Sequence, residues 1–490
     1  MDKRRYIVTV DLGTTSIRTL AYDITGHEII NVARKKITQY YPQPGWVEQD
    51  AVEIVNSVVE CLARTISDLP EESIFGLGVT NQRETTVAWD PKTGKPYAKA
   101  IVWQCRRTHD EILELKKSKR TCDMLHRRTG LIPSSYFSAT KMSWLLKNDE
   151  KVAKARAKGR LYFGTLDTYL VYCLTNGKSF VTDHSNASRT LLYNLKLQDW
   201  DNELCQFFGV PRETLAQIVN CDDYVGDCVI KGKKLKIGGI IGDQQGSLFG
   251  QNCVNNGDIK TTYGTGAFML ANIGNTPVFN QRLLTTVAWS TREGMTYALE
   301  GNMYTAGACI NWLQDSLHLI ESPKESETLA GSVENTGGVF FVPALAGLGA
   351  PFWKGDARAR FEGISLSTTS AQLVRSVLRG IAYNTRAVFD CMRDTYPISE
   401  KQLKVDGGMS TNGLMMQFQS DILHFPVAVS TETESTSLGA CYMCGLCFGA
   451  FKSTADLNNL YTSRKIYKPT AHDTQREKNY QKWLEIIEKC

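Results

Sequence analysis

The 490-residue chain is predicted to form an α/β protein built from two similar halves. Hydrophobic residues make up 42% of the chain and charged residues 22%, so it can bury sizeable cores. Strand-like and helical segments alternate along the whole length, as they do in α/β proteins. A strand, a tight Gly/Thr turn and a second strand occur near the start of each half, at 6–23 and at 258–272. This weak internal duplication indicates two related domains.

The first half opens with strand-like runs at 6–10 and 17–23 on either side of the turn. Residues 51–66 show helical periodicity, and Asp50 is placed to cap that helix. Further strands are expected at 74–80 and 100–103, followed by a mostly helical region that includes 138–148 and 165–175.

The second half repeats this order of elements after a strand that ends at Asp243. Strands broken by a Gly/Thr turn are expected at 258–272, and a Gly-rich turn is expected within 404–410. Helices are expected at 306–319, 412–423 and 475–490. We place the boundary in the polar stretch 250–258, which gives domains 1–252 and 253–490. No low-complexity linker separates them, so a large shared interface around a cleft is expected.

Charge and hydropathy exclude several classes of protein. The net charge is +5 without basic blocks, so nucleic-acid binding is not implied. The longest uncharged stretch, 435–451, is shorter than a bilayer requires. The first apolar run meets Asp11 after only a few residues, unlike a secretory signal. The expectation is a cytoplasmic protein that does not enter membranes.

Fourteen cysteines without an export signal indicate a reducing compartment and mostly free thiols. Cys441, Cys444 and Cys447 begin an iron–sulfur spacing, but the fourth ligand position holds Phe451 and no proline follows. Packing of small side chains on an apolar helix is favoured. A metal-binding or oxidation-sensitive module remains an alternative.

The turn Asp11–Ser16 is the first candidate for chemistry. Glycine lets the backbone approach a ligand, and successive N–H groups and hydroxyls can hold phosphate oxygens. Asp11, at the strand end, is placed to hold a hydrated Mg²⁺. An ordinary hairpin turn uses the same residue types, so this motif alone leaves both interpretations open.

In the second half, Tyr263–Phe268 repeats this chemistry, and a third Gly-rich turn, Val405–Gly408, follows another strand. The latter precedes a helix, whose N-terminus suits an anionic or nucleotide group. Together the three turns favour a nucleotide cleft between mirrored halves. The patterns of P-loop enzymes, dinucleotide dehydrogenases and protein kinases do not occur in the sequence.

Two segments could act on a substrate alcohol. Asp243 ends a strand beside Gln244 and is the candidate base for phosphoryl transfer to a hydroxyl. A helix N-cap is its structural alternative. Arg83 offers a planar fork to hydroxyl oxygens and Glu84 accepts hydroxyl protons, which suits a polyol, although a surface ion pair would use the same residues.

These motifs resemble the FGGY family of carbohydrate kinases over essentially the whole chain. The resemblance rests on DLGTTS with Arg18, NQRETT, WQCRRT, YFSATKMSWLL, GDQQGSLFGQ, TTYGTGAF and KVDGGMSTNG. NQRETT and WQCRRT resemble the glycerol-using branch. The resemblance implies two ribonuclease H-like domains of the actin and sugar-kinase type with an interdomain nucleotide cleft. It further implies ATP-dependent transfer of phosphate to glycerol, giving sn-glycerol 3-phosphate and ADP, with Mg²⁺, and a homodimer or homotetramer.

Carried over by position, the resemblance assigns each site residue. The ATP phosphates would contact Thr14, Thr15, Ser16 and Arg18. The rest of the nucleotide would meet Thr265, Gly307, Asn311, Gly408 and Asn412. Glycerol would be held by Arg83, Glu84, Tyr136, Asp243 and Gln244, with Trp103 and Phe268 as apolar walls. Asp243 would be the catalytic base, and Asp11 would hold Mg²⁺ with its help.

The chain departs from the family pattern at several positions. Leu12 and Asn311 stand where the family usually or often has Gln. Residues 229–239 have no counterpart of the fructose-bisphosphate loop of bacterial members, so inhibition by that sugar phosphate is not expected.

Two other functions remain open. One is an FGGY kinase for another polyol or a pentulose. The other is a non-catalytic nucleotide switch resembling actin, although such a switch would not require a polyol site at Arg83, Trp103 and Asp243.

Overall fold

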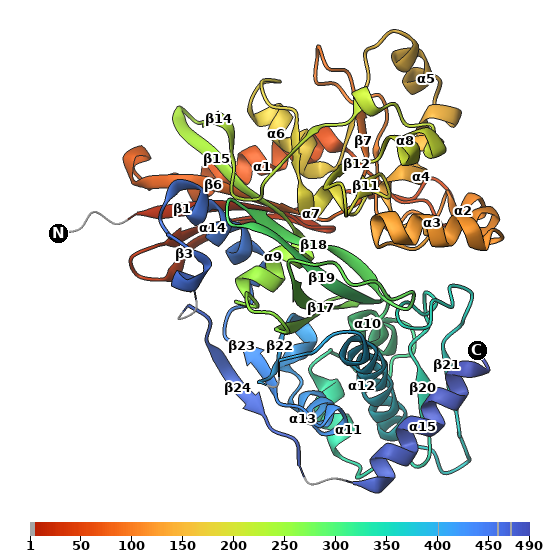
Figure 1. Cartoon of the computed structure of the whole chain (residues 1–490). Helices are drawn as coiled ribbons and strands as arrows, with labels where there is room; N and C mark the ends of the chain where they lie inside the picture. The colour runs from red at the N-terminus through yellow and green to blue at the C-terminus, as the bar shows by residue number, and fades with distance from the viewer. Residues whose placement is uncertain (1–4, 400, 458–459, 471–472) are drawn as a thin grey trace.

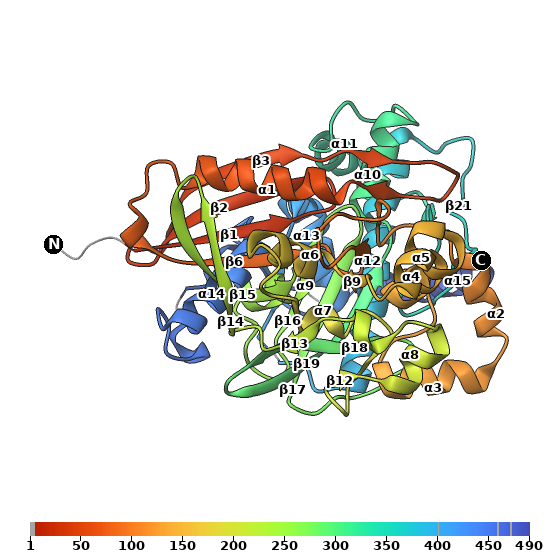
Figure 2. The same ribbon diagram turned by 90° about the horizontal axis from the view of Figure 1, so that it is seen from above.

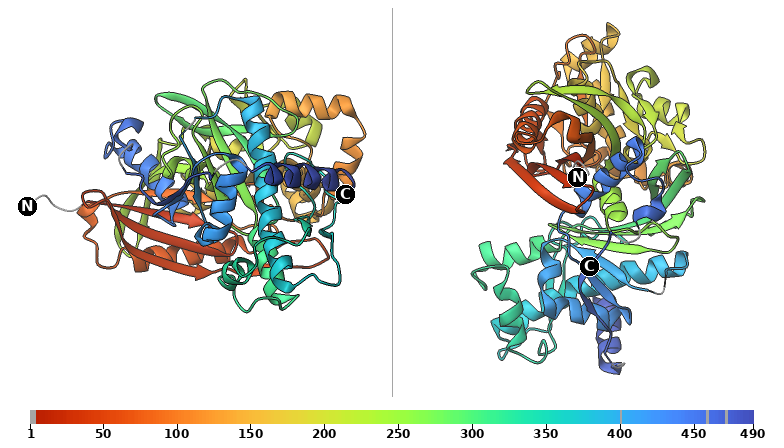
Figure 3. Two further views of the ribbon diagram at one scale, coloured as in Figure 1. Left: turned by 90° about the horizontal axis from the view of Figure 1, so that it is seen from below. Right: turned by 90° about the vertical axis from the view of Figure 1, so that its left-hand side faces the viewer.

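A computed structural model describes residues 5–399, 401–457, 460–470 and 473–490. The chain forms two α/β lobes, one above the other in Figure 1, and the right panel of Figure 3 shows the narrower zone between them. None of the helices in these ranges combines the length and hydrophobicity that a bilayer crossing needs.

The first sheet has six strands in the order β14-β15-β6-β1-β2-β3. Their bounds are β1 Tyr6–Leu12, β2 Ser16–Asp23, β3 Glu28–Lys36, β6 Ile74–Asn81, β14 Tyr224–Ile230 and β15 Lys233–Gly242. Strands β1, β2 and β3 are antiparallel neighbours, whereas β6 runs parallel to β1, and β15 runs parallel to β6. Helix α1 (Ala51–Thr65) lies along β2 and β3 (Figure 2). Asp50 caps it by accepting from Val52 N, as predicted.

The second sheet has seven strands in the order β18-β19-β17-β16-β22-β23-β24. Their bounds are β16 Ile259–Tyr263, β17 Ala267–Gly274, β18 Leu284–Thr291, β19 Gly294–Met303, β22 Leu403–Asp406, β23 Val427–Ser430 and β24 Ser463–Tyr467. Strands β16, β17 and β19 are antiparallel neighbours, and β22 and β23 extend the sheet in parallel from β16. The run β19-β17-β16-β22-β23 therefore repeats β3-β2-β1-β6-β15 in order and direction, and the predicted duplication is confirmed.

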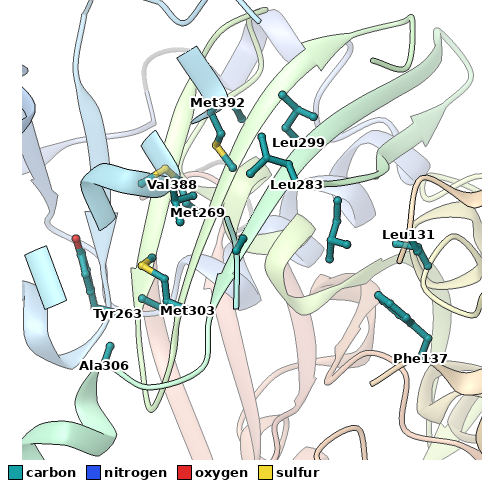
Figure 4. Close-up of a cluster of buried hydrophobic side chains, with 14 of the residues drawn as sticks. Leu131, Phe137, Tyr263, Met269, Leu283, Leu299, Met303, Ala306, Val388 and Met392 are labelled. Atoms are coloured by element: carbon teal, nitrogen blue, oxygen red, sulfur yellow. The ribbon is translucent and has the colours of Figure 1, made fainter. Parts of the chain in front are cut away.

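The second sheet carries the 26-residue helix α12 (Ser370–Thr395) on one face. Figure 4 shows Val388 and Met392 of this helix against Met269 and Leu299, from β17 and β19. Gly301 makes the close approach possible, because a Cβ there would lie 2.3 Å from Val388 Cγ1. The closing helix α15 (Thr474–Glu488) crosses α12, as the left panel of Figure 3 shows.

Helices α9 (Asp243–Gly250) and α14 (Ser435–Phe448) join the two halves. They cross so closely that a Cβ at Gly250 would lie 1.9 Å from Ser435 O, and one at Gly439 would lie 1.9 Å from Gly246 O. Although α14 comes late in the chain, it packs on β1, β6 and β15 of the first sheet. The sequence boundary between residues 252 and 253 stays a prediction.

The three spaced cysteines lie on α14 and act in packing, as predicted. All fourteen cysteines are free, and Cys441, Cys444 and Cys447 are buried. A Cβ at Gly238 would lie 2.5 Å from Cys447 Sγ, so small residues on both elements allow the helix to lie close to the sheet. Burial raises the pKa of the Cys447 thiol to about 12. Within the described ranges, no group of three or more metal-ligating side chains occurs.

The remaining elements surround these two sheets. In the first half they are β4 Gln39–Tyr40, β5 Glu48–Gln49, β7 Val87–Trp89, β8 Ala100–Ile101, α2 His109–Lys116, α3 Lys119–Thr129, α4 Ser138–Asn148, α5 Glu150–Ala157, β9 Tyr162–Gly164, α6 Leu166–Leu174, β10 Val181–Asp183, α7 His184–Ala187, β11 Tyr193–Asn194, β12 Asp199–Trp200, α8 Asn202–Phe208 and β13 Gln217–Val219. In the second half they are α10 Gly307–Asp315, α11 Glu325–Gly331, β20 Phe340–Val342, β21 Arg360–Glu362 and α13 Gly413–Leu423. Short 3₁₀ turns occur at Glu71–Ser73, Arg212–Thr214, Gly408–Thr411 and Thr454–Leu457.

Two expected elements are shorter than predicted. The strand expected over 100–103 keeps only Ala100–Ile101, and the helix expected over 306–319 ends at Asp315.

Candidate active site

The first hairpin joins β1 to β2 and is held by side chains from other loops. Thr14 Oγ1 accepts from Trp103 Nε1 at 3.0 Å, and Thr14 O accepts from Gln49 Nε2 at 2.6 Å. Ser16 Oγ accepts from Arg34 Nε at 3.0 Å. Thr15 at the tip is exposed. The turn therefore has a fixed backbone and presents a free hydroxyl at its tip.

Asp11 and Arg18 face each other across this hairpin as register partners. Arg18 forms an ion pair with Glu434, which immediately precedes α14, so the first hairpin touches a segment of the second half. Burial raises the pKa of Asp11 to about 7; Arg18 opposes this shift, and the Asp243 carboxylate adds to it. Asp11 and Asp243 are thus close enough to repel each other.

Arg83 is the centre of the site. Its side chain is 1% exposed, and its Nε lies 3.1 Å from Asp243 Oδ1. Its two terminal nitrogens donate to Glu300 at 2.6 and 3.1 Å, and Nη2 also reaches the Tyr136 hydroxyl at 3.4 Å. The alternative of a solvated surface ion pair is wrong, because neither Arg83 nor Glu84 is on the surface.

Glu84 sits in a left-handed backbone conformation, with φ of 64°. Arg189 Nε donates to its Oε1 at 2.7 Å, and Arg189 Nη2 donates to Glu300 Oε1 at 3.0 Å. A non-glycine residue with positive φ is uncommon and marks a constrained position. This constrained backbone holds the Glu84 carboxylate beside Arg83 in a fully buried network.

Glu300 and Arg189 were missed by the sequence reasoning. Glu300 lies on β19 of the second half, so the Arg83 guanidinium is held from across the two halves. Although burial opposes it, the attraction of Arg189 and Arg83 lowers the pKa of Glu300 to about 2. The sequence feature that could have indicated Glu300 is that it is the single charged residue in the segment 294–303.

Asp243 is the first residue of α9, and Gly242 occupies the capping position. The N-cap interpretation of Asp243 is therefore wrong. Its Oδ1 accepts from Gln244 N at 2.7 Å and faces Arg83, and its side chain keeps 27% exposure. Burial raises the pKa of Asp243, and Arg83 opposes that shift. The carboxylate is both oriented and accessible.

The two aromatic residues expected as walls, Trp103 and Phe268, come from different halves of the chain. The Trp103 and Tyr136 rings meet edge to face with centroids 5.4 Å apart. Phe268 is half-buried on β17, opposite Thr262 of β16. Trp103 thus contacts both the first hairpin and a candidate substrate residue.

A polar chain leads from Gln244 to the second half. Lys260 Nζ donates to Gln244 Oε1 and to Thr262 Oγ1, each at 2.8 Å. Thr262 Oγ1 lies 3.0 Å from Ser247 Oγ, which donates to Asp406 Oδ2 at 3.3 Å. Asp406 also accepts from Ser435 Oγ, next to Glu434. Both hairpins are therefore connected through α9 and the start of α14.

The second hairpin is closed by backbone contacts. Thr265 O accepts from Ala306 N at 2.9 Å, and Gly307 N donates to Gly264 O at 3.0 Å. Gly407 has φ of 86°, and a Cβ there would lie 2.3 Å from Tyr263 O. The Gly-rich turn and the hairpin therefore lie against each other.

The nucleotide residues expected near this hairpin lie at three places. Thr265 and Gly408 are exposed beside the packed turns. Asn311 is exposed on α10. Asn412 caps α13 by accepting from Met415 N at 2.9 Å and donates to Ser326 Oγ. Neither asparagine makes a recorded contact with the Arg83 network, and their part in nucleotide binding stays a prediction.

Comparison with known proteins identifies the family. The model for the FGGY family of carbohydrate kinases, N-terminal domain, matches residues 6–250, and that for the C-terminal domain matches 259–447. The chain belongs to this family. Among curated relatives, glycerol kinase 2 of Thermotoga maritima is 43% identical over 99% of this chain and 98% of its own length. Glycerol kinase of Carboxydothermus hydrogenoformans is 44% identical over the same shares.

The FGGY fold expected from the sequence is confirmed by solved structures. The glycerol kinase of Plasmodium falciparum with ADP superposes with a TM-score of 0.91 at 33% identity, over 99% of this chain and 98% of its own. A gluconate kinase of Lactobacillus acidophilus, with a TM-score of 0.87 at 20% identity, shares the fold. The two sheets, which share a run of five strands, thus belong to the two ribonuclease H-like domains of an FGGY carbohydrate kinase.

The donor set of this FGGY site fits a hydrated magnesium ion. Asp11 and Asp243 each carry a raised pKa, and Asp243 contributes to the shift at Asp11. Mg²⁺ commonly binds one or two carboxylates together with waters and substrate phosphates rather than a cage of protein ligands. A divalent cation between these two carboxylates would relieve their repulsion.

Proposed function

We propose that this FGGY kinase transfers the γ-phosphate of ATP to glycerol, giving sn-glycerol 3-phosphate and ADP. The observation that carries the proposal is the pairing of the accessible Asp243 carboxylate with the buried Arg83 guanidinium at 3.1 Å. Full-length curated relatives at 43% and 44% identity carry the name glycerol kinase, which supports glycerol as the acceptor.

Glycerol is bound by polar groups on one side and apolar rings on the other. Arg83 and Gln244 donate hydrogen bonds to hydroxyl oxygens. Glu84 accepts a hydrogen bond from a hydroxyl at its Oε2, because its Oε1 already accepts from Arg189. Trp103 and Phe268 contact the carbon backbone, and Tyr136 lies between Trp103 and Arg83. Because Arg83, Glu84 and Gln244 are already held by neighbouring residues, little reorganisation of these polar groups is needed when the substrate binds.

Asp243 acts as the general base. As the terminal hydroxyl oxygen attacks the γ-phosphorus in line, its proton passes to an Asp243 carboxylate oxygen, the bond from phosphorus to the bridging oxygen breaks, and ADP leaves. Arg83, at 3.1 Å, orients the carboxylate. Asp11 and Asp243 would hold Mg²⁺, which neutralises phosphate charge when bound.

The phosphates of ATP lie between the two hairpins. Their proposed contacts are Thr14, Thr15, Ser16, Arg18 and Thr265. The rest of the nucleotide meets Gly307, Asn311, Gly408 and Asn412. Arg18 is already paired with Glu434, so phosphate binding shares or replaces that ion pair.

The substrate assignment is tested by measuring ADP production from ATP·Mg²⁺ with purified protein and glycerol, dihydroxyacetone, erythritol or xylulose, with a blank that contains no polyol. Glycerol should give the highest kcat/KM, because a site that hydrogen-bonds substrate hydroxyls discriminates strongly against mismatched analogues. A higher kcat/KM for xylulose or erythritol would replace glycerol with that acceptor. ADP production that needs no acceptor would remove the kinase assignment.

We also propose a cytoplasmic location. All fourteen thiols are free, which suits a reducing compartment.

A further inference from the structure

Lys260 is a buried cation with no assigned role. It lies on β16, is fully buried, and donates to two neutral oxygens, Gln244 Oε1 and Thr262 Oγ1. No carboxylate of the described residues lies within 4 Å of its ammonium. Burying an ammonium without a carboxylate partner is costly, so a purely structural role would favour an apolar residue here.

The electrostatic surroundings lower the pKa of this lysine, but the amine stays mostly protonated at neutral pH. Burial, with a contribution from Arg83, lowers the pKa of Lys260 to about 8, while Asp406, Asp243 and Glu300 oppose the shift. Its ammonium therefore lies inside the candidate active site, between the substrate side and the Gly-rich turn that begins at Asp406.

Hydrogen-bond chemistry then determines the orientation of Gln244. A charged lysine has three donors and no acceptor, so only the carbonyl oxygen of the Gln244 amide can face it. The amide nitrogen must point the other way, with two N–H groups to donate. Without Lys260 the amide would be free to rotate and to present either end to the substrate.

We propose that Lys260 is a positioning residue for the acceptor alcohol: it fixes the Gln244 amide so that its N–H groups donate to a substrate hydroxyl oxygen. This inference rests on the proposed function and deepens it by assigning the direction of one substrate hydrogen bond. Thr262 completes the arrangement: its hydroxyl oxygen accepts from Lys260, and its hydroxyl proton is available to Ser247, because the Ser247 hydroxyl itself donates to Asp406.

The test uses Lys260→Met, Gln244→Met and the double variant, in which the side chains keep similar lengths. Lys260→Met should raise the glycerol KM, and the glycerol Kd by calorimetry, about 10- to 100-fold, as the loss of one oriented hydrogen bond in a buried site does. The Kd for ADP should change little. Because Lys260 acts through Gln244, the double variant should lose no more glycerol affinity than the worse single variant.

The matched control is Lys404→Met. Lys404 is the register partner of Lys260 on β22, but its ammonium donates to Gln251 O and Asn252 O. This control should change thermal stability without changing the glycerol Kd. It distinguishes the effect of removing any lysine of this sheet from the effect of removing the contact with Gln244.

Lys260→Met with an unchanged glycerol Kd would overturn the inference, as would losses that add fully in the double variant. Lys260→Arg addresses folding: an arginine keeps the donors, so a stable Lys260→Arg protein should bind glycerol more tightly than Lys260→Met. If the unmodified protein phosphorylates no glycerol, the proposed function fails first, which is a separate result.

Discussion

The two halves of the molecule share a run of five strands with the same order and direction, but they differ in the charged side chains that they place near the site. The first half places Asp11, Arg18, Arg83, Glu84 and Asp243 at its strand ends, and much of this charge is buried. The second half offers hydroxyls, glycines and backbone groups at its hairpin and at the turn around Gly407. Three of its buried charged side chains, Glu300, Lys260 and Asp406, bond to residues of the first half.

This difference indicates how a duplicated fold gains asymmetric chemistry. The common strand order supplies two hairpins that meet near α9 and α14, and the residues on the hairpins decide what each does. One half carries the groups that we propose bind and deprotonate an alcohol. The other presents uncharged groups that suit a nucleotide and holds the first half's cations in place.

Removing the proposed base from the first half should have the largest effect. Asp243→Asn keeps the size of the side chain but cannot accept the hydroxyl proton, so kcat should fall by about 10²- to 10⁴-fold. Calorimetry with ADP should show nucleotide binding retained, because the second hairpin is untouched. Turnover at the unmodified rate in a steady-state ADP assay would remove Asp243 from its role.

Removing the link between the halves should come next. Glu300→Gln removes the carboxylate that bridges the buried Arg83 and Arg189 and leaves each with a single close carboxylate partner, so the free energy of unfolding should fall by on the order of 3 kcal/mol. Chemical denaturation measures this loss. Glu114→Gln is the control, since the Lys117–Glu114 pair is exposed and should matter little. Equal effects of the two substitutions would mean that Glu300 does not hold the halves together.

Two adjacent glycines of the second half, Gly407 and Gly408, provide a smaller, paired test. Gly407→Ala forces a Cβ to within 2.3 Å of Tyr263 O at φ of 86°, and should cost about 1–3 kcal/mol of stability. Gly408→Ala places its Cβ in open space and should leave the melting temperature unchanged. If Gly408 lines the nucleotide site, that same variant should raise the KM for ATP. Equal melting temperatures for the two variants would contradict the close contact at Gly407.

The smallest effect concerns a buried carboxylate of the first half that lies away from the site. Burial, reinforced by Asp183, raises the pKa of Asp167 to about 6. The folded state therefore holds this proton more tightly than the unfolded state. Because of Asp167, the free energy of unfolding decreases as pH rises from about 4 to 6. Asp167→Asn should become progressively more stable relative to the unmodified protein over that range, by on the order of 1–2 kcal/mol. A difference that does not change with pH would contradict the burial of a charge there.

Local signals in the sequence were sufficient for much of this molecule. The strand–turn–strand repeat predicted two similar halves, and Asp50 at the head of an apolar periodic segment predicted α1 and its cap. Asp243 and Arg83 were found because each ends a strand beside other polar residues, and the structure brings them together.

Long-range partners were not predictable in the same way. Glu300 is 217 positions from Arg83, and Lys260 is 16 positions from Gln244. Each is the single charged residue of its strand, and the sequence of the strand is equally compatible with that side chain facing solvent. Only sheet register and the crossing of α9 with α14 bring them to the site. The pairing of Arg18 with Glu434, 416 positions away, has the same origin.

The late position of α14 affects how the protein is made. Strands β1, β6 and β15 are complete once residue 242 has left the ribosome, but the helix that covers one face of them ends at Phe448. During synthesis, roughly two hundred further residues emerge while that apolar face has no permanent cover, a period in which exposed surfaces favour aggregation. A fragment that stops at the domain boundary would keep this face open, so the first domain completes its core only when the second has been translated.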